Sequence, residues 1–171
     1  EVIGLLRPGM REHDVAAEIS YRHRRLGADG DGFDPIVASG ERGSLPHARA
    51  SEKVIRKGDL VTLDFGCTVA GYHSDLTRTV AIGHATRRAR DIHRLVREAQ
   101  EAALAAARGG IRASELDAVA RRVIADGGYG PAFSHSLGHG LGLHIHERPR
   151  VSSLSTETLT AGSVITVEPG I

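Results

Sequence analysis

Residues 135–147 read HSLGHGLGLHIHE and hold four of the ten histidines of the chain within twelve positions. Glycines are interleaved with them, and a glycine lets backbone and side chains approach a bound group closely. Imidazole is a common metal ligand and a common proton donor or acceptor near neutral pH. Surface histidine runs also occur, but four histidines spaced by glycines favour a binding site. The segment is therefore the first candidate for metal-binding or catalytic chemistry.

Three carboxylates lie outside this segment at the ends of strand-like stretches. Asp64 follows the apolar run 61–63, Asp75 lies eleven residues further on, and Glu168 follows residues 164–167, VITV. A carboxylate placed there is costly to bury unless it is paired or bound to a metal. Either aspartate alone could instead cap a turn or pair with a nearby arginine. Together with an imidazole, the three supply the mixed oxygen and nitrogen ligands that suit Mn, Co, Fe or Zn.

Apolar periodicity predicts long helices interleaved with antiparallel strands, which is typical of an α+β domain. Thr86 is the expected N-cap of the longest helix, and Ser114, with Asp117 at N3, that of the next. A hairpin with a tight turn near Gly66 is expected to bring Asp64 and Asp75 together. The predicted helices are 11–26, 86–108 and 114–127, and the predicted strands are 35–39, 60–65, 69–82 and 164–167.

Composition limits the protein classes. A length of 171 residues with 40% apolar content predicts one domain over residues 1–171. The 22 basic and 21 acidic residues nearly balance, so neither nucleic acid nor a membrane surface is an expected partner. No stretch approaches the roughly 20 apolar residues that span a bilayer, and no signal peptide is recognisable, so a cytoplasmic protein is expected. Cys67 is the single cysteine and is interpreted as a core thiol.

The two ends of the sequence suggest a piece of a longer chain. It opens on Glu1 without an initiator Met, as if inside a helix, and stops at Ile171 directly after a predicted strand. We therefore expect truncation at both ends, with an N-terminal domain and the last C-terminal strands lying outside the sequence.

The order and spacing of five motifs resemble the M24 metallopeptidase superfamily of creatinase, methionine aminopeptidase and prolidase. The resemblance covers nearly the whole chain and implies the pita-bread fold, a curved antiparallel sheet with flanking helices. Within the superfamily, the first, third and fourth motifs are most similar to Xaa-Pro dipeptidase (prolidase) and Xaa-Pro aminopeptidase (aminopeptidase P). The motifs are LPHA at 45–48, GDLVTLDFG at 58–66, GYHSDLTRT at 71–79, the histidine segment running on into Arg148 and Pro149, and TVEPG at 166–170.

The resemblance implies a ligand set for two divalent metal ions, with Mn or Co expected first and Zn or Fe as alternatives. Asp64 would bind one ion, Asp75 would bridge both, and His139 and Glu168 would complete the shell of the other. A fifth ligand, a second bridging glutamate, is expected beyond Ile171. Without it, we expect the chain as given to bind metal weakly or at one site.

The implied reaction is hydrolysis of an Xaa-Pro peptide bond by a hydroxide that the metal pair activates. Glu168 would be the general base, while His47, His135 and His146 would contact the substrate. The expected partner is a peptide with proline at the second position, and a homodimer is a possible assembly. Methionine aminopeptidase, a metal-independent creatine-type hydrolase and a non-catalytic binding module of the same fold are the alternatives. The other six histidines are interpreted as surface or structural: His13, His23, His73, His84, His93 and His144.

Overall fold

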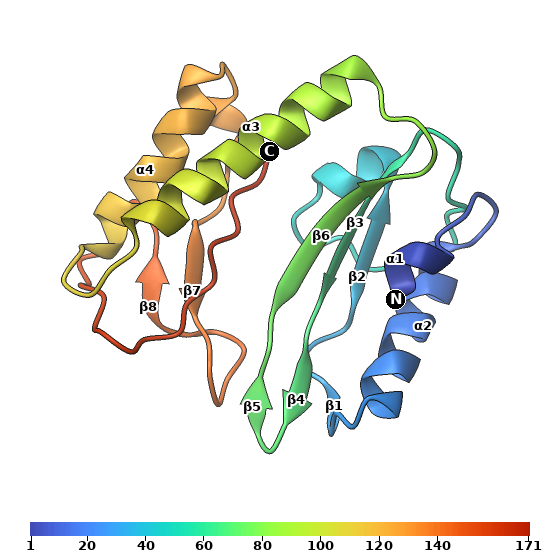
Figure 1. Ribbon diagram of the computed structural model, residues 1–171, viewed down its shortest axis with the longest axis horizontal. Helices are drawn as coiled ribbons and strands as arrows, with labels where there is room; N and C mark the ends of the chain where they lie inside the picture. Colours follow the sequence, from blue (N-terminus) through green and yellow to red (C-terminus); the bar gives the residue numbers. More distant parts are fainter. The chain divides into compact units, whose positions relative to one another are not determined.

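The computed structural model describes residues 1–171 and divides into two compact units, Glu1–Ala89 and Arg90–Ile171 (Figure 1). Each unit has its own buried apolar cluster, as expected when a helix and a sheet each bury one face. The single domain expected over residues 1–171 stays a prediction. A membrane-spanning helix is not found: every helix is either too short or too polar for that.

The first unit is built on the antiparallel sheet β2-β3-β6, formed by Ile36–Ser39, Leu60–Phe65 and Leu76–Ala81. Helix α2, Glu12–Arg25, lies beside β2 and buries Val15 and Ile19 in the core, which confirms the predicted helix (Figure 1). The unit also holds the short helix α1, Val2–Leu5, and the 3-10 helix η1, Gly40–Ser44, which follows β2.

The predicted hairpin turns later in the chain than expected. Strands β3 and β6 pair in register, but the chain continues past Gly66 into β4, Cys67–Val69, and β5, Tyr72–His73, and turns between them. Strand β4 also pairs with the two-residue β1, Gly30–Asp31. Gly66 is needed for a close approach rather than a turn, because a Cβ there would lie 1.8 Å from the carbonyl oxygen of Ser74. The single strand predicted over 69–82 is therefore wrong.

Cys67 is not the core thiol that the sequence suggested. It is half-buried at the start of β4, and its Sγ lies 3.5 Å from Oγ of Ser74.

Helix α3, Arg87–Ala106, begins as predicted, since the backbone N–H of Ala89 donates to Oγ1 of Thr86 at 3.1 Å. Helix α4, Ala113–Asp126, begins two residues earlier than predicted, with Arg112 and not Ser114 at the N-cap. Its start is set by backbone pairing: Arg112 bridges Thr158, and Ala113 N–H donates to the carbonyl oxygen of Glu157. That contact comes from a segment distant in sequence, so local capping signals could not show it.

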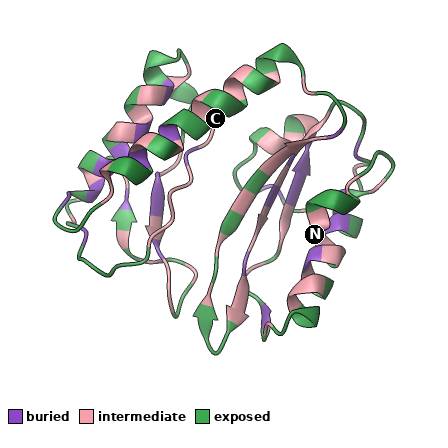
Figure 2. Ribbon diagram, in the orientation of Figure 1, coloured by how far each residue is buried: buried purple, intermediate pink, exposed green.

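The second unit packs α4 against the 3-10 helix η2, Gly130–Ala132, and against β8, Glu147–Val151, which pairs with β7, Gly138–Gly140. Its core includes Leu116, Ile124 and Leu137, and Figure 2 shows buried positions along β7 and on one side of α4. Strand β8 could not be predicted, because its residues ERPRV hold three charges and a proline.

The strand predicted over 164–167 is present as an extended segment beside β7, but not as a regular strand. Backbone bonds join Thr166 N–H to the carbonyl oxygen of His139 at 2.8 Å and Glu168 N–H to that of Leu137 at 2.9 Å. Only Ile165 forms a β-bridge, with Gly140. The approach requires Gly138, where a Cβ would lie 2.1 Å from the carbonyl oxygen of Thr166.

Candidate metal centre

His139 and Glu168 face each other in the second unit. His139 lies in β7 and Glu168 at the end of the extended segment beside it, with 3.2 Å between Nε2 and Oε1. Their side chains are 14% and 34% exposed, so both are reachable from solvent without being surface groups. The backbone bonds between β7 and residues 164–168 hold the pair in place.

The other ring nitrogen of His139 fixes the tautomer. Nδ1 lies 2.9 Å from the carbonyl oxygen of Gly140, and a carbonyl can only accept, so Nδ1 carries a hydrogen. Nε2 therefore holds either a second proton, donated to Glu168, or a lone pair that can bind a cation. A nitrogen and a carboxylate oxygen so placed are a suitable pair of ligands for one divalent ion.

Thr166 orients both members of this pair. Its hydroxyl donates to Oε1 of Glu168 at 2.8 Å and accepts the backbone N–H of His139 at 3.0 Å. Burial raises the pKa of the Glu168 carboxyl, but hydrogen bonds from His139 and Thr166 and the positive charge of His139 outweigh burial and bring that pKa below its usual value. The carboxylate therefore stays ionised at neutral pH, as a ligand or base requires.

His146 and His135 lie in the same unit as this pair. The ring of His146 packs edge-on against that of His139, with 4.4 Å between ring centroids. The ring of His135 packs edge-on against Phe133 at 5.0 Å, and its Nδ1 lies 2.9 Å from the carbonyl oxygen of Ser136.

Asp64 and Asp75 lie near the end of one ladder in the first unit. Asp64 pairs with Thr77, and the last pair at this end is Phe65 with Leu76, so Asp75 lies directly before β6. Asp75 is therefore two residues from Thr77, the partner of Asp64 in the ladder. Both aspartates are half-buried.

His47 lies on an exposed loop of the first unit whose base is held by a buried carboxylate. Glu12, at the start of α2, is 0% exposed and accepts the N–H and hydroxyl of both Ser39 and Ser51. Arg42 donates to the same carboxylate through Nε at 3.1 Å. These contacts fix both ends of the loop that carries His47.

Neither unit by itself gathers three His, Cys, Asp or Glu side chains in an arrangement that could hold a metal ion. The donor chemistry of His139 and Glu168 nevertheless fits a metal, because Nε2 and Oε1 converge while Nδ1 is committed elsewhere. The ligand set Asp64, Asp75, His139 and Glu168 stays a prediction.

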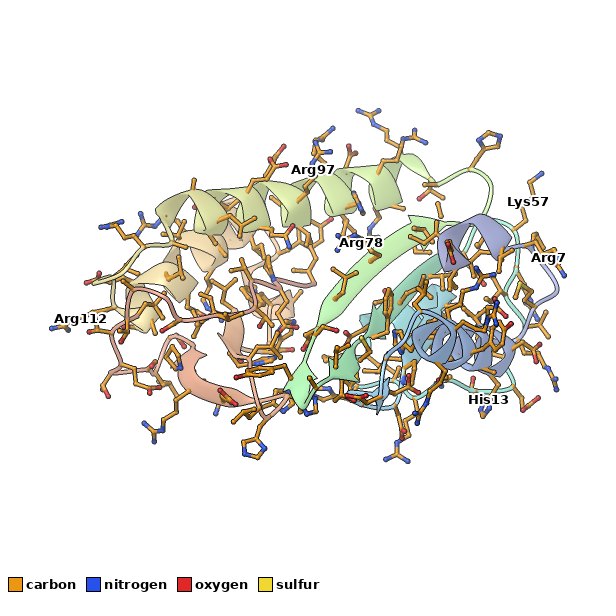
Figure 3. All side chains as sticks on the ribbon, turned by 60° about the horizontal axis from the view of Figure 1, so that its bottom comes forward. Arg7, His13, Lys57, Arg78, Arg97 and Arg112 are labelled. Carbon is orange, nitrogen blue, oxygen red and sulfur yellow. The ribbon has the colours of Figure 1, made fainter.

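Most of the histidines set aside as surface groups are exposed, and His13 projects outward from α2 in Figure 3. His23 and His73 are half-buried structural residues; Nδ1 of His23 lies 2.5 Å from Oδ1 of Asp31. Sequence reasoning missed Thr166, although a residue two before Glu168 in an extended segment shares its face. It also missed Glu12, which acts through contacts distant in sequence.

Comparison with known proteins shows the family. Residues 1–171 match Metallopeptidase family M24. The chain is 48% identical over 163 residues to the Xaa-Pro dipeptidase of Pyrococcus horikoshii, covering 95% of this chain and 46% of that protein. It is 49% identical over 163 residues to the Xaa-Pro dipeptidase of Pyrococcus furiosus, covering 95% and 47%. The chain thus spans about half the length of the curated relatives it matches.

Solved structures agree on the fold. The prolidase from Pyrococcus furiosus superposes with a TM-score of 0.98 at 48% identity, covering 99% of this chain and 50% of that chain. The X-Pro aminopeptidase from Thermotoga maritima gives a TM-score of 0.97 at 46% identity, covering 99% and 48%. The predicted α+β pita-bread fold is confirmed, and the chain belongs to metallopeptidase family M24.

Proposed function

We propose that this chain carries the metal-binding residues of an exopeptidase that hydrolyses the peptide bond before proline in Xaa-Pro dipeptides. The observation that carries the proposal is the convergence of His139 Nε2 and Glu168 Oε1 at 3.2 Å. This pair occurs in a chain 48% identical to an Xaa-Pro dipeptidase. The similarity to an X-Pro aminopeptidase makes longer peptides with proline second the other substrate class.

Asp64, Asp75, His139 and Glu168 are the residues proposed to hold two divalent ions, with Mn or Co favoured. Three carboxylates and one imidazole suit such ions, since oxygen ligands predominate and no thiolate is involved. When bound, the ions supply Lewis acidity and a water whose pKa is lowered toward neutrality.

Glu168 is proposed as the general base. Thr166 donates to its Oε1, which leaves Oε2 as the oxygen that takes a proton. The depressed pKa of its carboxyl keeps it ionised at neutral pH. The proton is then delivered to the departing proline nitrogen, which has no hydrogen of its own in the peptide bond.

His135 and His146 are proposed to donate hydrogen bonds to the substrate as negative charge develops on the carbonyl oxygen. His47, on the loop anchored by Glu12, is proposed to contact the residue after the scissile bond. Since proline offers no N–H, its recognition must rest on the shape of the ring.

The test is Asp75→Asn in the intact protein, measured as metal-dependent release of proline from Xaa-Pro dipeptides. We expect metal-dependent activity to be abolished with the fold retained, because Asp75 is proposed to bind both ions directly. Asp126→Asn, at the exposed end of α4, is the matched control and should keep full activity. Undiminished activity of Asp75→Asn would remove the metal role, and preferred cleavage of Met-Ala-Ser would favour a methionine aminopeptidase.

A further inference from the structure

Helix α4 carries an ion pair, between the buried Asp117 and the half-buried Arg121, that the proposed reaction does not use. Asp117 is 0% exposed, and its two carboxylate oxygens accept Nε of Arg121 at 2.8 Å and Nη2 at 3.0 Å. A two-point contact of this kind fixes the guanidinium plane as well as its position. The pair lies one helical turn apart on the same face of α4.

This ion pair is also hydrogen-bonded to the backbone of three alternate residues in the segment before β7. Arg121 donates through Nη1 to the carbonyl oxygen of Phe133 at 2.7 Å and through Nη2 to that of His135 at 2.9 Å. Oδ1 of Asp117 accepts the backbone N–H of Leu137 at 3.1 Å. The guanidinium further lies over the ring of Phe133, 4.1 Å from its centroid.

Two proposed functional residues depend on the segment held in this way. The ring of His135 packs edge-on against Phe133, so Arg121 holds the backbone of His135 and the ring that supports its imidazole. The carbonyl oxygen of Leu137 accepts the backbone N–H of Glu168 at 2.9 Å. The ion pair therefore bonds the backbone of His135 directly and is linked to the backbone of Glu168 through Leu137.

Packing alone does not require a charged pair here. Apolar side chains of similar volume often replace a buried ion pair without loss of stability. What apolar groups cannot do is hold two carbonyl oxygens and one N–H in fixed directions. A lysine cannot do so either, because its single nitrogen lacks the planar array of donors that reaches a carboxylate and two carbonyls together.

We infer that Asp117 and Arg121 are positioning residues that set the imidazole of His135 for its contact with substrate. The contact of His135 with substrate is part of the proposed function, and the inference rests on it. The contacts of Asp117 and Arg121 do not depend on that function. Arg121 touches no reacting atom in this account; it acts through Phe133 and the backbone of His135.

The first test is kinetic and uses Arg121→Lys, His135→Ala and the double variant in the intact protein. Arg121→Lys should lower kcat for an Xaa-Pro dipeptide about 10-fold to 100-fold, with KM changed much less. The double variant should be no slower than His135→Ala alone, because residues that act through one group are not additive. Arg122→Lys, the exposed neighbour on α4, is the matched control and should match wild type.

The second test does not depend on activity. In protein labelled with ¹⁵N at histidine, the ring signals of His135 should shift in Arg121→Lys and stay in place in Arg122→Lys, at equal thermal stability. Asp117→Asn, which keeps side-chain shape but removes the charge, should shift the same signals if Arg121→Lys folds poorly. Additive kinetic losses, or unmoved His135 signals in a folded variant, would overturn the inference. A wild-type protein inactive on Xaa-Pro peptides would instead overturn the proposed function, and the ring signals would still decide the positioning role.

Discussion

Nε2 of His139 lies 3.2 Å from Oε1 of Glu168, while Nδ1 of the same ring donates to the carbonyl oxygen of Gly140. With Nδ1 committed, the nitrogen facing Glu168 is the one that can hold either a second proton or a cation. A divalent ion and that proton compete for one lone pair, so the geometry couples metal uptake to proton release.

The first prediction is that metal binding by this pair releases protons, because the ion displaces the proton that Nε2 of His139 would otherwise share with Glu168. Titration of Mn²⁺ or Co²⁺ by calorimetry in two buffers of different ionisation enthalpy would measure the release. His139→Ala should abolish this component, and His144→Ala, an exposed histidine, should leave it unchanged. Binding heats that are the same in both buffers would contradict the coupling.

The second prediction concerns Thr166, whose hydroxyl serves both Glu168 and the backbone of His139. Thr166→Val keeps the shape but removes both hydrogen bonds, so metal affinity should fall about 10-fold or more. Thr166→Ser restores the hydroxyl and should recover most of it. Thr160→Val, at an exposed position, is the control. Equal affinities for the Val and Ser variants would show that the hydroxyl does not orient the pair.

The third prediction is that Gly138→Ala separates the extended segment from β7. The added Cβ would lie 2.1 Å from the carbonyl oxygen of Thr166, which is backbone and cannot rotate away. We expect a loss of about 1–3 kcal/mol in the free energy of unfolding, together with weaker metal binding. Urea unfolding measures the first effect. Gly4→Ala, with nothing within 4 Å of the new Cβ, is the control and should cause no loss of stability.

The fourth prediction is a pH dependence of stability from Glu12. Burial raises the pKa of its carboxyl, but hydrogen bonds from Ser51 and Ser39 and the charge of Arg42 outweigh burial and lower that pKa below its usual value. A lowered pKa means that the carboxylate stabilises the fold at neutral pH and that this contribution is lost as the pH falls.

Glu12→Gln should therefore be less stable than wild type by about 1.5–3 kcal/mol at pH 7, the usual range for hydrogen bonds to a charged group. The difference should shrink as the pH falls to about 4 and below, where the wild-type carboxylate takes up a proton. Urea unfolding at several pH values gives the comparison, with Glu52→Gln at an exposed neighbouring position as the control. A difference that is constant over this range would contradict the linkage.

Local sequence signals predicted the elements that depend on local interactions. Helix α2 follows from its apolar spacing, and the start of α3 follows from Thr86, whose hydroxyl caps it. Local sequence signals gave the wrong boundary where contacts with a segment distant in sequence set the start of an element. The start of α4 is set by pairing with residues 157–158, so Ser114 lies inside the helix instead of capping it.

In the candidate site, too, the sequence identified residues but could not show the contacts that bring them together. Residue type and position pointed to His139 and Glu168, but their pairing depends on the 28 intervening residues folding β7 against the extended segment. Arg121 gave no signal because an arginine on an amphipathic helix is usually a solvated residue. Only the structure shows that its donors reach the carbonyls of Phe133 and His135.

Strand β7 has hydrogen-bonded neighbours on both sides, with β8 on one and residues 164–168 on the other. It therefore presents no open edge to another chain, and its amides cannot meet solvent without the loss of one flank. The amide of His139 should consequently rank among the slowest in the second unit to exchange with deuterium.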